Sequence, residues 1–164
     1  MKKMCLCALI LLAPAVARAE GKVELRVVKF DGLEKAIQAA KGKVVVIDFW
    51  ATFCIPCMKE FPNLVKLHKK YGDDIVCISV TVDENEDKPK AKALKFLTKQ
   101  EAAFTNLLLD EPAEDWQKKF SAGAVPIVMV YGKDGKLVKK FTADEKELSY
   151  EKDVFPVVDG LMKK

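Results

Sequence analysis

The chain has 164 residues, enough for a single domain with a full hydrophobic core, and no repeat or low-complexity tract interrupts it. Its formal net charge is +4, but Lys2, Lys3 and Arg18 all lie before residue 20, and without them the charge is +1. A domain so close to neutral gives no reason to expect nucleic acid or an anionic lipid surface as a partner.

The N-terminal segment is typical of a secretory signal. Two lysines precede an apolar run from Leu6 to Ala17, and a small-x-small pattern that suits signal peptidase ends at Ala19. The apolar run, about twelve residues, is shorter than the roughly 20 residues of a membrane-spanning helix. We therefore expect a signal peptide over residues 1–19 and an exported domain over residues 20–164. An uncleaved membrane anchor is the alternative.

The rest of the chain alternates between strand and helix patterns. In the first half we expect a strand over 23–30, a helix over 33–40 with Asp31 as its N-cap, a strand over 44–49, a helix over 54–71 that contains Pro62, and a strand over 75–82. In the second half we expect a helix from Pro89 to about 101, a strand over 107–109, a helix over 113–121 and a strand over 125–131. A hairpin at 133–136 leads to a strand over 137–141, and a helix over 151–162 is the last expected element. This order predicts an α/β fold with a mixed central sheet and helices on both faces.

The segment from Asp48 to Cys57, DFWATFCIPC, carries the chemistry. Cys54 lies where a buried strand turns into a helix, and the free N–H groups and positive dipole of a helix start favour a thiolate. Ligands of such sheets bind at this edge, at the carboxyl ends of the strands. We expect Cys54 to be a partly exposed nucleophile beside Trp50 and Phe53, and Cys57 to be the resolving thiol that closes a disulfide with it.

Other readings of the two cysteines are a structural disulfide and half of a zinc site. Zinc needs four ligands, and the chain offers only His68 and a third cysteine, Cys77, which is expected to be buried in a strand. We therefore predict no metal. Between the cysteines, Ile55 and Pro56 provide no cation, and Pro56 provides no N–H group to hold a thiolate, which favours a pair poised toward reduction.

Two residues outside the pair are expected to assist it. Asp48 closes a buried strand, where desolvation raises the pKa of a carboxyl, so it could take the proton from Cys57; a half-exposed strand end is the alternative. Pro126 begins an otherwise apolar strand and is costly there. A cis Val125–Pro126 bond would explain it and would aim the Val125 backbone at a substrate chain; an ordinary proline at a strand start is the alternative.

This combination of residues resembles the thioredoxin superfamily, and most of all its exported TlpA-like thiol–disulfide oxidoreductases, which include reductants of cytochrome c maturation. The matching positions are Asp48, Trp50, Cys54, Pro56, Cys57, Pro62 and Pro126. The resemblance runs from about Val44 to the end. It implies a thioredoxin-like three-layer sandwich with an extra N-terminal strand and helix, and a helix–strand insertion over 83–110.

By this resemblance, Cys54 is the attacking cysteine, Cys57 the resolving one, Asp48 the buried acid and Pro126 the cis-proline. Three positions depart from the family pattern. Phe53 replaces the usual tryptophan and Ile55 the usual glycine, while the lysine that pairs with the buried acid in thioredoxins is replaced by Ser79. The first two changes alter the surface that a partner touches.

The leading hypothesis is an exported reductase of protein disulfides that is recharged by a membrane electron donor. We expect a monomer without a cofactor and a substrate surface made of Trp50, Phe53, Ile55, Pro56, Val125 and Pro126. A dithiol oxidant that forms disulfides and a copper-binding module on the same fold are the alternatives. A peroxidase is disfavoured because Ala51 stands where such enzymes need a hydroxyl.

Overall fold

The computed structural model describes residues 22–145 and 147–163, so the predicted signal segment, residues 1–19, lies outside the described residues. The strands are β1 (Arg26–Val28), β2 (Val44–Trp50), β3 (Ile75–Thr81), β4 (Thr105–Leu109), β5 (Ile127–Tyr131) and β6 (Leu137–Thr142). The helices are α1 (Phe30–Ala39), α2 (Ile55–Tyr71), α3 (Asp87–Lys99), α4 (Ala113–Phe120) and α5 (Phe155–Met162), with a 3₁₀ turn at Gly72–Asp74 and a π-helical turn at Tyr150–Val154. The α/β fold with a mixed sheet is thus confirmed.

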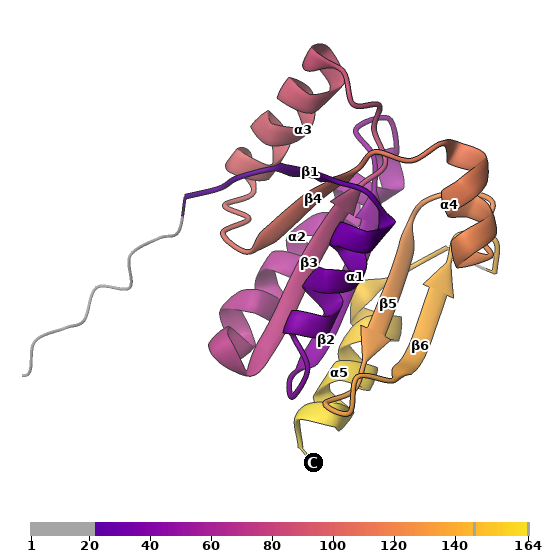
Figure 1. Ribbon diagram of the computed structural model, residues 1–164. Coiled ribbons are helices and arrows are strands. Elements are labelled where there is room, and N and C mark those ends of the chain that lie inside the picture. The colour runs from indigo at the N-terminus through magenta and orange to yellow at the C-terminus, as the bar shows by residue number, and fades with distance from the viewer. Residues whose placement is uncertain (1–21, 146, 164) are drawn as a thin grey trace, which may run out of the picture.

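The strands form one sheet in the order β1-β4-β3-β2-β5-β6, with α1 in front of it and α2 behind it in Figure 1. Strands β1, β4, β3 and β2 are parallel, and β5 and β6 are antiparallel to their neighbours. All seven residues of β2 are buried, because helices cover both faces of this central strand and β3 and β5 flank it. The end of β2 therefore lies at a defined edge of the sheet, where the chain turns toward Cys54.

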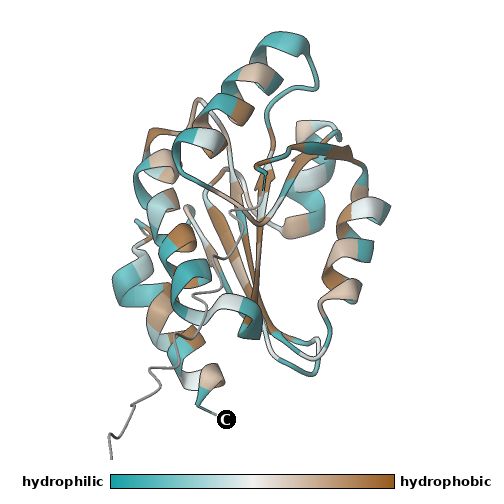
Figure 2. Cartoon of the chain, turned by 90° about the vertical axis from the view of Figure 1, so that its left-hand side faces the viewer, coloured by the Kyte–Doolittle hydropathy of each residue, from teal (hydrophilic) through white to brown (hydrophobic). Residues whose placement is uncertain are grey.

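Side chains of β2 alternate between two hydrophobic layers. Val44, Val46 and Trp50 face α2, α3 and α5, whereas Val45, Ile47 and Phe49 face α1 and α4. Figure 2 shows the apolar strands in brown between helices whose outer sides are largely hydrophilic. By the same alternation Asp48 points into the first layer, beneath the helix that begins after Cys54.

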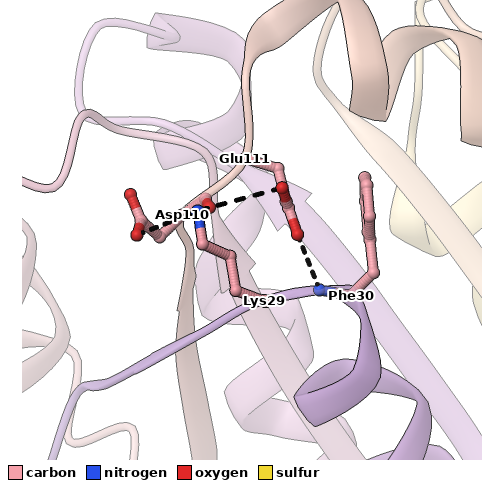
Figure 3. A network of polar contacts seen from close by, with 4 residues as sticks. All are labelled: Lys29, Phe30, Asp110 and Glu111. Carbon is pink, nitrogen blue, oxygen red and sulfur yellow. Dashed lines mark hydrogen bonds and ion pairs between the residues drawn. The ribbon is translucent and has the colours of Figure 1, made fainter.

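The N-terminal strand is shorter than the pattern predicts, and the first helix begins earlier. Strand β1 pairs with β4 only from Arg26 to Val28, and α1 begins at Phe30 rather than after an Asp31 cap. The reason is tertiary. The N–H group of Phe30 donates to Glu111 Oε1 at 3.0 Å, and Lys29 Nζ lies 3.9 Å from the other oxygen of Glu111 (Figure 3). A carboxylate from the loop that follows β4 thus caps α1.

The last helix and the strand after Pro126 also differ from their predicted bounds. The segment predicted as a helix from Glu151 starts as the π-helical turn Tyr150–Val154, which is capped by the Ser149 hydroxyl. Strand β5 starts at Ile127, two residues later than predicted. Pro126 has no N–H group for the ladder, so pairing begins after it.

We predict that Glu111→Ala lowers the free energy of unfolding by about 1 kcal/mol, because the start of α1 loses its acceptor. Urea unfolding would measure this change. Glu111→Gln keeps an acceptor oxygen and should retain most of the stability, and Glu147→Ala, at an exposed position, should be neutral. Equal losses in the Ala and Gln variants would assign the effect to the ion pair with Lys29 instead.

Candidate active site

Cys54 and Cys57 form a disulfide at the first turn of α2, with their Cα atoms 5.3 Å apart. Cys54 is the N-cap residue of the helix, and its Sγ accepts a hydrogen bond from the Cys57 N–H group at 3.3 Å. The same N–H group would stabilise a Cys54 thiolate after reduction, together with the positive end of the helix dipole. The site can therefore store and release two electrons.

Cys54 is less exposed than the sequence predicts. Cys54 is 7% exposed and Cys57 is 3% exposed, whereas the flanking side chains Phe53 and Ile55 are 71% and 75% exposed. Pro56 is also exposed. A partner would therefore meet apolar side chains on both sides of Cys54 before it reaches the sulfur.

Val125 closes the site from the other side. Its carbonyl oxygen lies 3.7 Å from Cys54 Sγ, and its peptide bond to Pro126 is cis. A groove of about 510 Å³ runs from the disulfide toward α4, lined by Phe53, Cys54, Ile55, Pro56, Ala113, Trp116, Gln117, Gly123, Ala124 and Val125. Trp116 was not identified from the sequence as a site residue.

Two predicted substrate contacts do not fit. Pro126 is buried and does not line the groove. The other is Trp50. Its side chain is completely buried, with ring centroids 5.2 Å from Phe61 and 4.9 Å from Phe96. Trp50 is the last residue of β2 and points into the layer beneath α2, so no substrate can contact its side chain. Trp50 instead stabilises the end of β2 by packing against Phe61 and Phe96.

Asp48 lies in the same layer and is 3% exposed. Burial raises the pKa of this carboxyl to about 7, and the nearby carboxylate of Glu60 adds to the rise. The hydroxyl of Tyr150 opposes it by donating a hydrogen bond to Asp48 Oδ2 at 2.6 Å. Neither Tyr150 nor Glu60 was identified from the sequence. Glu60 lies one turn beyond Cys57 on the same helix, a spacing that could have revealed it, whereas Tyr150 carries no such signal.

Among the residues that the structure describes, the hydroxyl of Ser79, which replaces the usual lysine, makes no hydrogen bond to Asp48. Ser79 lies beside Asp48 in the ladder, but its hydroxyl donates to Asn106 Oδ1 at 2.8 Å. The third cysteine, Cys77, is buried in β3, where burial raises the pKa of its thiol to about 12. A thiol with that pKa is a poor nucleophile at neutral pH, in agreement with its prediction as a core residue.

A buried carboxylate holds the loop before Cys54. The backbone N–H group and the hydroxyl of Thr52 donate to Asp83 at 2.9 Å and 2.7 Å, and the Thr81 hydroxyl also donates to Asp83. Lys92 Nζ donates to the Thr52 carbonyl at 3.3 Å. These contacts fix the chain just before the disulfide. Asp83 and Lys92 come from the segment after β3, and their part in the site was not foreseen.

In the described part of the chain, no three His, Cys, Asp or Glu side chains gather as metal ligands would. His68, the only histidine, stacks edge-on against Phe104 with ring centroids 5.4 Å apart. Among residues 22–145 and 147–163, none of the helices combines the length and apolar character of a membrane span.

The comparisons with known proteins agree with this geometry. The family model described as Redoxin matches residues 13–155. The chain belongs to the Redoxin family. This Redoxin domain is 30% identical over 120 residues to the thiol-disulfide oxidoreductase ResA of Bacillus cereus (strain ZK / E33L), which covers 73% of the chain and 66% of ResA. It is 41% identical over 59 residues to the thioredoxin-like protein YneN of Bacillus subtilis (strain 168).

The YneN match covers 36% of this chain and 35% of YneN, so the chain spans about a third of one curated relative and just under two thirds of the other. Among solved structures, a secreted Mycobacterium tuberculosis disulfide oxidoreductase, homologous to E. coli DsbE, is similar with a TM-score of 0.60. It is 21% identical and covers 76% of this chain and 86% of its own. This likeness shows that the Redoxin domain has the thioredoxin-like fold.

We predict that Asp48→Asn removes a pH dependence of stability. A carboxyl whose pKa is raised by folding stabilises the protein below its ordinary pKa, 3.8, and this stability is lost as the pH rises through about 7. Between pH 5 and pH 8, the oxidised wild-type protein should therefore lose about 3 kcal/mol relative to Asp48→Asn. Urea unfolding at both pH values measures the difference. The control Asp159→Asn removes a surface carboxyl whose pKa is lowered. It should therefore leave the change in stability between pH 5 and pH 8 as it is in wild type.

Proposed function

We propose that this Redoxin protein is a thiol–disulfide oxidoreductase that reduces disulfides of exported proteins. The observation that carries the proposal is the Cys54–Cys57 disulfide at a helix start, with the Val125 carbonyl 3.7 Å from Cys54 Sγ and a groove beside it. A redox pair that opens onto a peptide-sized groove suits a protein substrate. Similarity to ResA, a thiol-disulfide oxidoreductase, supports the same class of reaction.

The reaction proceeds by two thiol–disulfide exchanges. In the reduced protein the Cys54 thiolate attacks one sulfur of a substrate disulfide, and the second substrate sulfur leaves as a thiolate. Cys57 then attacks Cys54 Sγ and releases the first substrate sulfur. Two electrons pass to the substrate, and the protein is left with its Cys54–Cys57 disulfide. The buried carboxylate of Asp48, beneath the same helix, accepts the proton of Cys57.

Substrate recognition combines backbone pairing with apolar contact. The Val125 carbonyl offers an acceptor beside the reacting sulfur, so an extended substrate segment can pair with residues 124–126 as an added strand. Phe53, Ile55 and Pro56 then present apolar surface on either side of the substrate cysteine. Phe53 and Ile55 depart from the family pattern and would set the choice of partner.

We infer the direction of electron flow from the residues that surround Cys54. Strong oxidants need a stabilised thiolate, which makes their disulfide easy to reduce. Here Ile55 and Pro56 add no positive charge, and Pro56 adds no donor. The thiolate depends on the helix start alone, which favours a reducing pair.

Export rests on the N-terminal pattern of residues 1–19 and on the similarity to a secreted disulfide oxidoreductase of Mycobacterium tuberculosis. Disulfides persist outside the cytoplasm, so a reductase there needs a supply of electrons. We therefore include in the proposal a membrane dithiol donor that reduces the Cys54–Cys57 disulfide after each turnover, and a monomeric protein with no cofactor.

We predict that Cys57→Ser traps substrates as mixed disulfides on Cys54, because the resolving thiol is missing. The variant, incubated reduced with an extract of exported proteins, should give adducts on a non-reducing gel that disappear with a reductant. Cys54→Ser should trap nothing by the same route. Cys77→Ser in the Cys57→Ser background should leave the adducts in place. Adducts that need Cys77 would overturn the assignment of Cys54 as nucleophile.

We predict a reduction potential of about −270 mV for the Cys54–Cys57 couple, in the range of reductants of this fold. Equilibration with glutathione or dithiothreitol buffers, followed by alkylation of free thiols, measures it. A value above roughly −180 mV would instead favour a dithiol oxidant, because oxidants of this fold reach about −120 mV.

A further inference from the structure

One residue of the C-terminal segment hydrogen-bonds to two carboxylates, that of Asp48 in β2 and that of Glu60 in α2. The hydroxyl of Tyr150 donates to Asp48 Oδ2 at 2.6 Å, and the backbone N–H group of the same residue donates to Glu60 Oε2 at 2.9 Å. Tyr150 itself is completely buried. It lies 102 residues from Asp48 in the sequence and belongs to the π-helical turn that precedes α5. Such turns are frequent at functional sites.

The packing leaves the Tyr150 ring little freedom. Its centroid lies 6.1 Å from that of Phe155, and the ring belongs to the hydrophobic layer between the sheet and α2. Glu60, which holds the backbone of Tyr150, also accepts from Asn63 Nδ2 at 3.0 Å. The hydrogen bond from the Tyr150 backbone to Glu60 and the packing of the Tyr150 ring thus hold the hydroxyl against Asp48.

The titratable groups that face Asp48 in the described structure come from three elements. They are Tyr150 from the π-helical turn, Glu60 from α2 and Cys77 from β3. None of the three is a cation. Glu60 and burial both disfavour the ionised form of Asp48, so the Tyr150 hydroxyl is the group that favours it. A carboxylate in this position needs that hydrogen bond to remain a usable base.

We propose that Tyr150 is a positioning residue of the redox centre, whose hydroxyl orients the Asp48 carboxylate and stabilises its charged form so that it can accept the proton of Cys57. This inference rests on the function proposed above. It gives the C-terminal segment a part in the reaction, although Tyr150 touches neither sulfur nor substrate.

The step that Tyr150 supports is the second exchange. The Cys57 thiol passes its proton to Asp48, directly or through one water molecule, and the resulting thiolate attacks Cys54 Sγ in the mixed disulfide. The Cys54–Cys57 bond forms, the bond between Cys54 and the substrate breaks, and the substrate sulfur leaves with the electron pair. That thiolate takes a proton from solvent, and Asp48 later returns its own to solvent. The substrate is reduced by two electrons and the protein dithiol is oxidised.

Tyr150→Phe tests the proposal, since it removes only the hydroxyl. Without this donor the ionised form of Asp48 is less stable relative to the neutral form, so the pKa of Asp48 should rise by about one unit. This is measured on the oxidised protein by the ¹³C chemical shift of the Asp48 carboxyl against pH, assigned by its absence in Asp48→Asn. Tyr71→Phe is the matched control, because it removes a hydroxyl bonded to a different carboxylate, that of Asp159. It should leave the Asp48 titration unchanged.

The reduced protein gives a second readout. With an aromatic disulfide reagent, release of the second thiolate follows the attack by Cys57. At pH 6 this rate should fall about tenfold in Tyr150→Phe and recover near pH 9, where Asp48 is ionised in both proteins. In Asp48→Asn the rate should be slow at both pH values, and adding Tyr150→Phe should change it no further. An equal loss at both pH values in Tyr150→Phe alone would indicate a structural role and overturn the proposal.

Two outcomes separate this inference from the proposed function. If the wild-type protein exchanges no disulfide, the proposed function fails, while the carboxyl titration still decides whether Tyr150 controls Asp48. An Asp48 titration that is the same in wild type and Tyr150→Phe overturns the inference, whatever the activity. Should Tyr150→Phe not fold, fluorinated tyrosine at the chain's three tyrosines keeps the ring and strengthens the donor. It should then lower the pKa of Asp48, and no shift or a rise would contradict the proposal.

Discussion

Burial of β2 on both faces is the constraint on which the site depends. All seven residues of this strand are buried, and the strand ends at Trp50, which packs against Phe61 and Phe96. The end of the strand therefore cannot move without disturbing the aromatic cluster beneath α2. The loop that follows is held to Asp83 through Thr52, so Cys54 reaches the start of α2 on a rigid path.

The same burial creates the unusual acid of the site. Asp48 is part of the buried strand, so its carboxyl cannot be solvated by water, and its neutral form is favoured up to about pH 7. Its ionised form depends on what the protein supplies. In this chain that is a hydroxyl from Tyr150 rather than a cation, because Ser79 stands in place of the usual lysine. The Ser79 hydroxyl itself donates to Asn106. Burial of the strand and the raised pKa of Asp48 are therefore two consequences of one packing arrangement.

Several parts of the site were predictable because their signals are local. The apolar run over 44–49 marks a central strand, and two cysteines three apart at its end mark a redox pair at a helix start. Asp48 stands within an apolar stretch, so a raised pKa followed from burial alone. These features depend on neighbours in the sequence, and the periodicity of a short segment records them. Pro56, Phe53 and Ile55 were placed beside Cys54 for the same reason.

The sequence alone determined the strand–helix order, the redox pair and the buried acid. Tertiary structure decided which residues complete them. Tyr150 reaches Asp48 across 102 residues, Glu111 caps a helix 81 residues earlier, and Trp50 points inward rather than toward a substrate. The contacts of Tyr150 and Glu111 depend on how layers pack, and nothing in the pattern around either partner specifies them. Only the folded chain brings a hydroxyl, two carboxylates and the helix of Cys57 into one buried layer.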